Sequence, residues 1–224
     1  MEVSNMSKES QNTQVKSRER VQKHGEVFTA DREVNAMLDL VKNETERLDS
    51  RFLEPACGDG NFLIEILRRK LNVASNNYKK HKSQLQYEKD AIIAISSIYG
   101  IDILPDNAQE CRERLLNYFK DQYCTSFPKS FKQECLTSVE YLLSKNIILG
   151  DALTYRRIDN PDEWIIVSEW SMLPSGMMNR RDYEFSYLVG DTKSTETVDL
   201  FSDIPCETFS PQHFLNLNTQ TYGE

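Results

Sequence analysis

The sequence has no apolar run approaching the length of a membrane span, and its first thirty residues contain no apolar core of a secretory signal. It also lacks a basic surplus, since 27 Lys and Arg residues stand against 35 Asp and Glu residues, a net charge of −8. A protein that binds DNA on its own more often carries a basic surplus. These absences predict a chain that is neither secreted nor membrane-inserted, and they argue against tight, autonomous DNA binding.

Closely spaced cysteines are also absent. The five cysteines are odd in number and scattered, and no pair has the spacing of a zinc site: Cys57, Cys111, Cys124, Cys135 and Cys206. We therefore expect reduced thiols in a cytoplasmic protein, without a metal site. With 224 residues, of which 39% are hydrophobic, the chain suits one domain with a sizeable core. We expect a disordered start at 1–15, a folded domain at 16–189 and an acidic tail at 190–224.

Residues 51–69 organise the rest of the chain, because they predict a short strand, a glycine turn and an amphipathic helix. Gly58 and Gly60 permit positive φ angles in the turn and let a ligand approach bare backbone. Asn61 is placed to cap the helix that follows. The crevice at a strand's carboxyl end, beside a helix start, is where open α/β sheets bind ligands. The residues therefore predict a ligand site at this turn.

The rest of the chain continues the alternation of strands and helices. We expect a second strand at 98–103, a third strand and its turn at 146–153, a fourth strand at 164–167 and a further one at 183–189. A helix should begin at Pro105, since proline suits the first helical position. Residues 73–87 are polar and basic, and we expect an exposed insertion there. The pattern predicts an open α/β sheet.

Residues 54–63 read Glu-Pro-Ala-Cys-Gly-Asp-Gly-Asn-Phe-Leu. This resembles motif I of the S-adenosylmethionine-dependent DNA adenine-N6 methyltransferases of restriction-modification systems (type I or type IIG-like), whose usual form is Asp-Pro-Ala-Cys-Gly-Ser-Gly-Asn-Phe-Leu. The resemblance implies that this stretch binds S-adenosyl-L-methionine through Glu54, Ala56, Cys57, Gly58, Asp59, Gly60 and Asn61. Glu54 and Asp59 depart from the usual Asp and Ser. The residues alone leave open an ordinary turn of another nucleotide-binding fold.

Three further segments resemble motifs of the same family, in the expected order. Residues 25–29, Gly-Glu-Val-Phe-Thr, are similar to motif X, which implies that Phe28 and Thr29 contact the methionine end of the cofactor. A loop that merely packs Phe28 is the alternative. Residues 99–103, Tyr-Gly-Ile-Asp-Ile, resemble motif II, which assigns Asp102 to the ribose hydroxyls and Ile103 to the adenine ring. Residues 150–153, Gly-Asp-Ala-Leu, resemble motif III, whose Asp151, followed by Ala152, would accept from the adenine amino group.

The family's catalytic motif, Asn/Asp-Pro-Pro-Tyr/Phe after the fourth strand, is not recognisable. The nearest match, Asn160-Pro161, precedes that strand and reads as a turn. Glu169 and Trp170 occupy roughly the catalytic place, where an acid can accept from an amino group and a ring can stack on a flipped base. They are the candidate catalytic residues, and ordinary strand-end residues are the alternative. Whether the chain is an active enzyme stays open.

The resemblance implies a Rossmann-like class I methyltransferase sheet, incomplete, with helices on both faces. It implies a DNA adenine-N6 methyltransferase or one of its subunits, with DNA as a partner and a specificity subunit, a restriction subunit or a second copy supplying what this chain lacks. A catalytically inactive S-adenosylmethionine-binding protein of the same ancestry is the alternative. A methyltransferase acting on a small molecule or protein through Glu169 or Trp170 is the third hypothesis.

Overall fold

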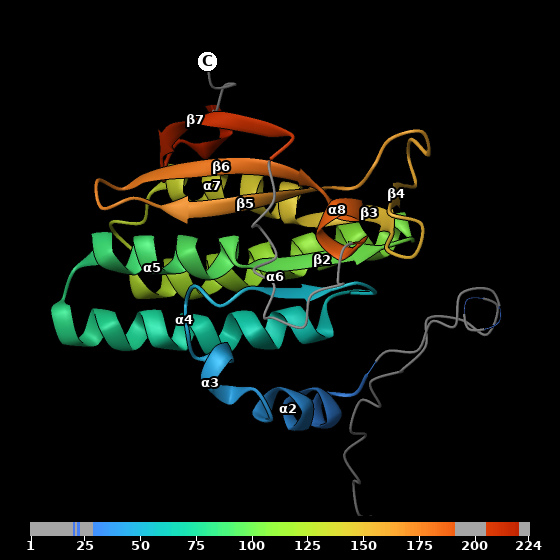
Figure 1. The fold of residues 1–224 in the computed structure, drawn as a ribbon. Helices are drawn as coiled ribbons and strands as arrows, with labels where there is room; N and C mark the ends of the chain where they lie inside the picture. The colour runs from blue at the N-terminus through green and yellow to red at the C-terminus, as the bar shows by residue number, and fades with distance from the viewer. Residues whose placement is uncertain (1–19, 21, 23–28, 191–204, 220–224) are drawn as a thin grey trace, which may run out of the picture.

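The computed structural model of the chain describes residues 20, 22, 29–190 and 205–219 (Figure 1). These residues form a mixed α/β fold with a four-stranded and a three-stranded sheet. The expected α/β class is therefore confirmed. The predicted disordered start at 1–15 and the predicted cofactor residue Phe28 lie outside the described residues.

The four-stranded sheet contains the first three strands that the sequence predicts. Its order is β1 (Phe52–Glu54), β2 (Ile98–Asp102), β3 (Ile147–Asp151) and β4 (Arg156–Arg157). The first three strands are parallel, whereas β4 is antiparallel to β3. Because parallel strands end at the same edge of a sheet, the turns after β1, β2 and β3 lie together there.

Two helices connect each successive pair of parallel strands. The helices of the first connection are α4 (Asn61–His81) and α5 (Gln84–Ser96), and those of the second are α6 (Pro105–Ser126) and α7 (Gln133–Asn146). Before β1 come α2 (Asp31–Asp39) and α3 (Lys42–Thr45). The predicted helix start at Pro105 is confirmed.

The two faces of the sheet are covered differently. A Cβ atom on Gly100 of β2 would lie 2.8 Å from Leu63 of α4. Its neighbour Tyr99 points to the opposite face, since side chains alternate along a strand. There the Tyr99 hydroxyl donates a 2.9 Å hydrogen bond to the carbonyl oxygen of Ser168 in β5. Thus α4, which contacts α6, covers one face, while β5, which contacts α7, lies against the other.

The predicted exposed insertion at residues 73–87 was only partly right, because residues 79–82 are exposed but the stretch belongs to α4 and α5. Leu71, Ala74 and Tyr78 extend the apolar stripe of α4 at helical spacing, so the helix continues to His81. The Ser83 side chain then caps α5 by accepting a 3.2 Å bond from the Gln86 N–H. The two helices pack side by side (Figure 1). The lysines on the exposed side of this stretch obscure the apolar period.

The three-stranded sheet consists of β5 (Ile166–Met172), β6 (Met177–Glu184) and β7 (Glu207–His213), all antiparallel. It lies at the top of the view in Figure 1. The fourth strand, predicted at 164–167, was wrong in its bounds, since β5 starts at Ile166 and runs to Met172; it pairs with β6. The strand predicted at 183–189 is instead the end of β6 followed by α8 (Phe185–Gly190).

Residues 205–219 of the predicted acidic tail belong to the folded body. They contain β7 and the 3₁₀ helix η1 (Leu217–Thr219), and they bury Phe214 and Leu217 completely. The Leu217 N–H donates a 3.3 Å bond to the Ser138 hydroxyl of α7. This part of the chain therefore closes one side of the core.

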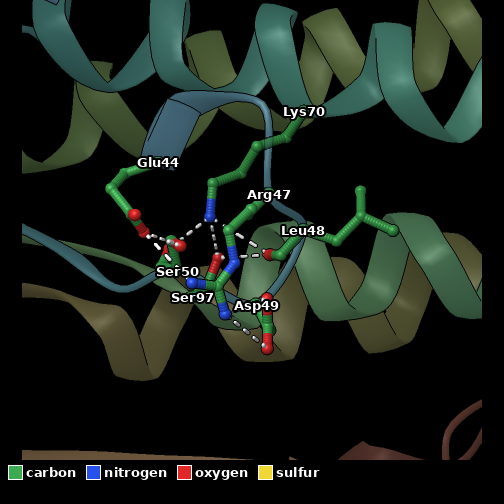
Figure 2. Close-up of polar contacts among 7 residues, drawn as sticks. All are labelled: Glu44, Arg47, Leu48, Asp49, Ser50, Lys70 and Ser97. Carbon is green, nitrogen blue, oxygen red and sulfur yellow. Dashed lines mark hydrogen bonds and ion pairs between the residues drawn. The ribbon is translucent and has the colours of Figure 1, made fainter. Parts of the chain in front are cut away.

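Buried Lys70 of α4 fixes the loop that leads into β1. Figure 2 shows its ammonium group pointing at that loop, where it donates to the carbonyl oxygens of Leu48, at 3.1 Å, and Ser50. It also donates to the Ser97 hydroxyl, at 2.5 Å. Burial lowers the pKa of Lys70 to about 7. The lysine thus ties the start of β1 to the segment before β2.

None of the described helices has the length and apolar character that a bilayer crossing requires.

Candidate functional site

A cavity of about 590 Å³ opens at the carboxyl edge of β1, β2 and β3. Its size falls within the range of small-molecule sites. All of the cofactor residues that the sequence predicts line it, except Phe28, which is not described, and Gly60, which is buried. The structure therefore brings together Thr29, the glycine turn and the ends of β2 and β3.

The glycine turn has the conformation that the sequence predicts. The φ angles of Gly58 and Gly60 are 54° and 92°, in the left-handed region that favours glycine. The Cys57 N–H donates to the Ile101 carbonyl oxygen of β2, and the Gly60 N–H donates back to the Cys57 carbonyl oxygen, both at 2.9 Å. A Cβ atom on Gly60 would lie only 2.7 Å from the Cys111 sulfur of α6. Glycine is thus required here by conformation and by space.

Asn61 does not cap α4 as expected. Gly60 occupies the cap position, and Asn61 is the first residue of the helix. The Asn61 amide nitrogen donates a 3.1 Å bond to the Thr29 carbonyl oxygen, while its amide oxygen accepts from Arg114 at 3.0 and 3.1 Å. The prediction failed because these contacts hold the side chain away from the helix start. Asn61 instead joins the segment before α2 to the turn.

Asp102 at the end of β2 shapes the cavity through backbone contacts. Its carboxylate accepts from the Gly58 N–H at 2.8 Å and from the Leu104 N–H at 2.9 Å. The Asn107 amide donates to the same carboxylate at 3.4 Å. Asp102 is only 8% exposed, so it holds the two turns together from within the cavity wall.

Where β2 and β3 end, the cavity is lined by Ile103, Asp151 and Leu153. The Asp151 carboxylate accepts a 2.9 Å bond from the Leu153 N–H, which tightens the turn after β3. The Ile103 and Leu153 side chains are 38% and 90% exposed, although both line the cavity. Ala152 lies between the acid and the exposed Leu. This side offers an acceptor beside apolar surface, the combination that a purine ring needs.

The pKa values of two residues of the turn, Glu54 and Cys57, are both raised. Burial raises the pKa of Glu54, and the Ala56 N–H opposes this through a 3.4 Å bond to its carboxylate. A hydrogen bond with the Cys111 thiol, together with burial, raises the pKa of Cys57 far above its usual range. Cys57 is therefore a neutral thiol and is unsuited to nucleophilic chemistry.

The charge of the lining is one-sided. Four carboxylates reach the cavity, those of Glu54, Asp59, Asp102 and Asp151, and none of the described lining residues is Lys, Arg or His. Arg114 pairs with Asp59 at 2.8 Å. In the part of the chain that the structure describes, no group of three or more His, Cys, Asp or Glu residues is arranged to hold a metal ion. The lining suits a neutral or cationic ligand.

The candidate catalytic residues Glu169 and Trp170 do not line this cavity. Both lie within β5, where Glu169 forms an ion pair with Arg51 at 2.8 Å. Trp170 is buried, and its indole N–H donates a 2.9 Å bond to the Asn146 amide oxygen of α7. The expectation that they stand at a strand end beside the ligand was wrong, because β5 extends past them to Met172.

Several lining residues were not predicted from the sequence. They are direct neighbours of the motif residues or lie one helical turn away: Pro55, Phe62, Leu104, Asn107 and Leu153. Asn107 follows Pro105 in the first turn of α6, so its position after the second strand was the available signal. Arg114 was missed entirely, since it lies two helical turns further along the same face.

A scan against protein-family models found no matching family, and searches of curated proteins and of solved structures found no match either.

Proposed function

We propose that this chain binds S-adenosyl-L-methionine at the carboxyl edge of β1–β3, in a Rossmann-like sheet of the class I methyltransferase type. The observation that carries the proposal is the cavity lining: a glycine turn, four carboxylates and no described basic side chain. Phosphorylated nucleotides are normally bound with help from Lys, Arg or a metal ion. S-Adenosyl-L-methionine has no phosphate, and its sulfonium and ammonium cations outweigh its single carboxylate, so its net positive charge suits this lining.

The residues have complementary tasks in this proposal. Glu54 faces the ammonium group, and the bare backbone of Gly58 lets the ligand lie against the turn. Asp102 accepts from the ribose with the lone-pair position left by its bonds to Gly58, Leu104 and Asn107. Asp151 accepts from the adenine amino group, while Ile103 packs on the ring. Thr29 closes the methionine end, where the Asn61 amide holds its carbonyl oxygen.

The activity that best fits this site is methyl transfer to adenine N6 in DNA, with a partner for recognition and catalysis. When bound, S-adenosyl-L-methionine supplies an electrophilic methyl group. This chain's contribution is to hold and orient that group, which accelerates transfer by placing the reactants in line. A specificity subunit, a restriction subunit or a second copy would supply the DNA contacts, in keeping with the net charge of −8.

A catalytically inactive S-adenosylmethionine-binding protein is the second candidate. It is favoured by the position of Glu169 and Trp170, which are held in β5 by Arg51 and Asn146 and not in the cavity. The same position removes the support for a methyltransferase that uses these two residues on a small molecule or a protein.

A binding and transfer experiment tests the proposal. Equilibrium dialysis with radiolabelled S-adenosyl-L-methionine should show binding that Asp151→Asn weakens about tenfold or more. The single amide oxygen of Asn stays with the Leu153 N–H, so the adenine amino group loses a charged acceptor, a bond of about 1.5–3 kcal/mol. Asp162→Asn, an exposed acid in the turn before β5, is the matched control and should bind normally. Equal binding by the two variants would contradict the assignment. Label transfer to DNA, with and without co-purified subunits, separates the active from the inactive alternative.

A further inference from the structure

The face of α6 that touches the cavity wall carries residues spaced four and three apart: Asn107, Cys111 and Arg114. Asn107 donates to Asp102, and Cys111 packs beneath Gly60. Arg114 reaches the turn itself, where one guanidinium nitrogen lies 2.8 Å from both the Asp59 carbonyl oxygen and the Asp59 carboxylate. A single helix thus contacts Asp102, Gly60 and Asp59.

Arg114 connects three parts of the site. Besides Asp59, it donates to the Asn61 amide oxygen with both terminal nitrogens, at 3.0 and 3.1 Å. Asn61 in turn donates to the Thr29 carbonyl oxygen at 3.1 Å. The planar, forked guanidinium makes these directional bonds at once, which an ammonium group does not. The contacts run continuously from α6 through the turn to Thr29.

Asp59 also needs a counter-charge. Its side chain is 17% exposed, and it lines the same cavity as Glu54, Asp102 and Asp151. Like charges confined to one partly buried site repel each other. Arg114, which does not line the cavity, forms an ion pair with Asp59 and offsets its charge. Asp59 replaces the Ser that the resembling motif usually has, and a Ser would need no such partner.

We infer that Arg114 is a positioning residue for the ligand: coupled to Asp59, it holds the glycine turn and Thr29 in the binding conformation. This inference rests on the proposed function, because it concerns the same cavity. It adds a residue that does not line the cavity. It also makes the effect of Asp59 on ligand affinity depend on Arg114. Arg114 itself does not touch the ligand.

Calorimetric titration with S-adenosyl-L-methionine tests the coupling in four chains: wild type, Arg114→Gln, Asp59→Ser and the double variant. Arg114→Gln should lose affinity at least tenfold, since it removes the guanidinium charge beside Asp59 and the bonds that hold the turn. Asp59→Ser should lose less affinity than Arg114→Gln, since Arg114 keeps its bonds to the backbone and to Asn61. The double variant should bind better than Arg114→Gln alone. A merely structural role of Arg114 gives no such rescue.

Hydrogen exchange of the ligand-free chains separates this inference from the proposed function. Arg114→Gln should speed exchange of the amides of residues 57–61 several-fold, whether or not S-adenosyl-L-methionine binds. Arg68→Gln, an exposed arginine paired with Glu65 on α4, is the matched control and should leave those amides unchanged. Arg114→Lys replaces Arg114→Gln if the latter fails to fold.

Three results would overturn the inference. Wild-type exchange at residues 57–61 in Arg114→Gln would mean that the guanidinium does not hold the turn. Unchanged affinity in that variant would mean that the turn's order does not matter for binding. A double variant that binds no better than Arg114→Gln would show that Arg114 does not act through the charge of Asp59. Absence of binding by wild type would overturn the proposed function instead.

Discussion

The Asp102 carboxylate at the end of β2 accepts a 2.8 Å hydrogen bond from the backbone N–H of Gly58, in the turn after β1. The residue proposed to bind the ribose therefore also fixes the turn against which the ligand lies. These two roles are compatible, since a carboxylate has about four lone-pair positions. Ligand affinity and local order should accordingly change together when Asp102 is altered.

Asp102→Ala should weaken the binding of S-adenosyl-L-methionine by about 1–3 kcal/mol and lower the free energy of unfolding by a similar amount, because buried N–H groups lose their acceptor. Calorimetric titration and urea unfolding measure the two effects. Asp102→Asn keeps one acceptor oxygen and should fall between Ala and wild type. Wild-type affinity in a folded Asp102→Ala chain would remove Asp102 from the site.

Gly60→Ala should destabilise the chain more than Gly176→Ala does. Both glycines have positive φ angles, 92° and 81°, so both substitutions strain the backbone, at about 1–2 kcal/mol each. Only at Gly60 does the new Cβ also meet a buried atom, the Cys111 sulfur at 2.7 Å. At Gly176 the nearest atom is the flexible end of Lys89, at 3.4 Å. Equal midpoints of thermal unfolding for the two variants would mean that α6 does not pack tightly beneath the turn.

Gly58→Val and Gly60→Val should abolish binding of S-adenosyl-L-methionine. Both need positive φ angles that valine resists, and a side chain at Gly58 would also fill the cavity. Titration of chains whose circular dichroism matches wild type is the measurement, with Gly176→Val as the control for backbone strain. Normal binding by Gly58→Val would place the ligand elsewhere.

The stability of the chain should depend on pH through Lys70. Burial lowers its pKa in the folded state to about 7, whereas the unfolded lysine keeps its ordinary value of 10.5. Between these values the unfolded state binds more protons, so the contribution of Lys70 to the free energy of unfolding rises with pH from about 7 to about 10.5. The charges of Asp49 and Glu44 oppose the shift, and that of Arg47 adds to it.

Urea unfolding of wild type and Lys70→Met at pH 6.5, 8 and 9.5 measures this dependence. The difference in the free energy of unfolding between the two chains isolates Lys70 from the other titrating groups. The value for wild type minus that for Lys70→Met should increase as pH rises. A difference that is constant across the three pH values would contradict the lowered pKa.

Trp170→Ala should lower the free energy of unfolding by about 3–5 kcal/mol, because it empties a buried site and removes the partner of Asn146.

Glu169→Gln should leave the affinity for S-adenosyl-L-methionine unchanged, since its carboxylate faces Arg51 and lies outside the cavity lining. Titration and urea unfolding of each variant give the comparison. A loss of affinity in folded Glu169→Gln would return this residue to the site.

The sequence predicts the parallel strands well because each is a local unit bounded by a turn or a helix start. The glycines of residues 57–61 specify their own backbone, which is why the positive φ angles could be predicted. The second sheet could not be predicted in this way. β5 pairs with β6, and β6 pairs with β7 from the far end of the chain, so their partners depend on distant residues.

The same reasoning separates the predicted from the unpredicted parts of the candidate site. Asp102 and Asp151 are the last residues of strands that end at one edge of the sheet, so the cavity follows from the topology. Arg114 belongs to a long helix with many charged residues, and only the packing of α6 under the turn distinguishes it from the others. Glu169 was misplaced because the end of β5 depends on its hairpin with β6.

Calorimetric titration of the purified chain with S-adenosyl-L-methionine, alongside ATP under the same conditions, tests the central claim most directly. We predict saturable binding of S-adenosyl-L-methionine with one ligand per chain and no detectable binding of ATP, because the cavity carries four carboxylates and no described basic side chain. Binding of ATP, or no binding of S-adenosyl-L-methionine by a demonstrably folded chain, would contradict the account.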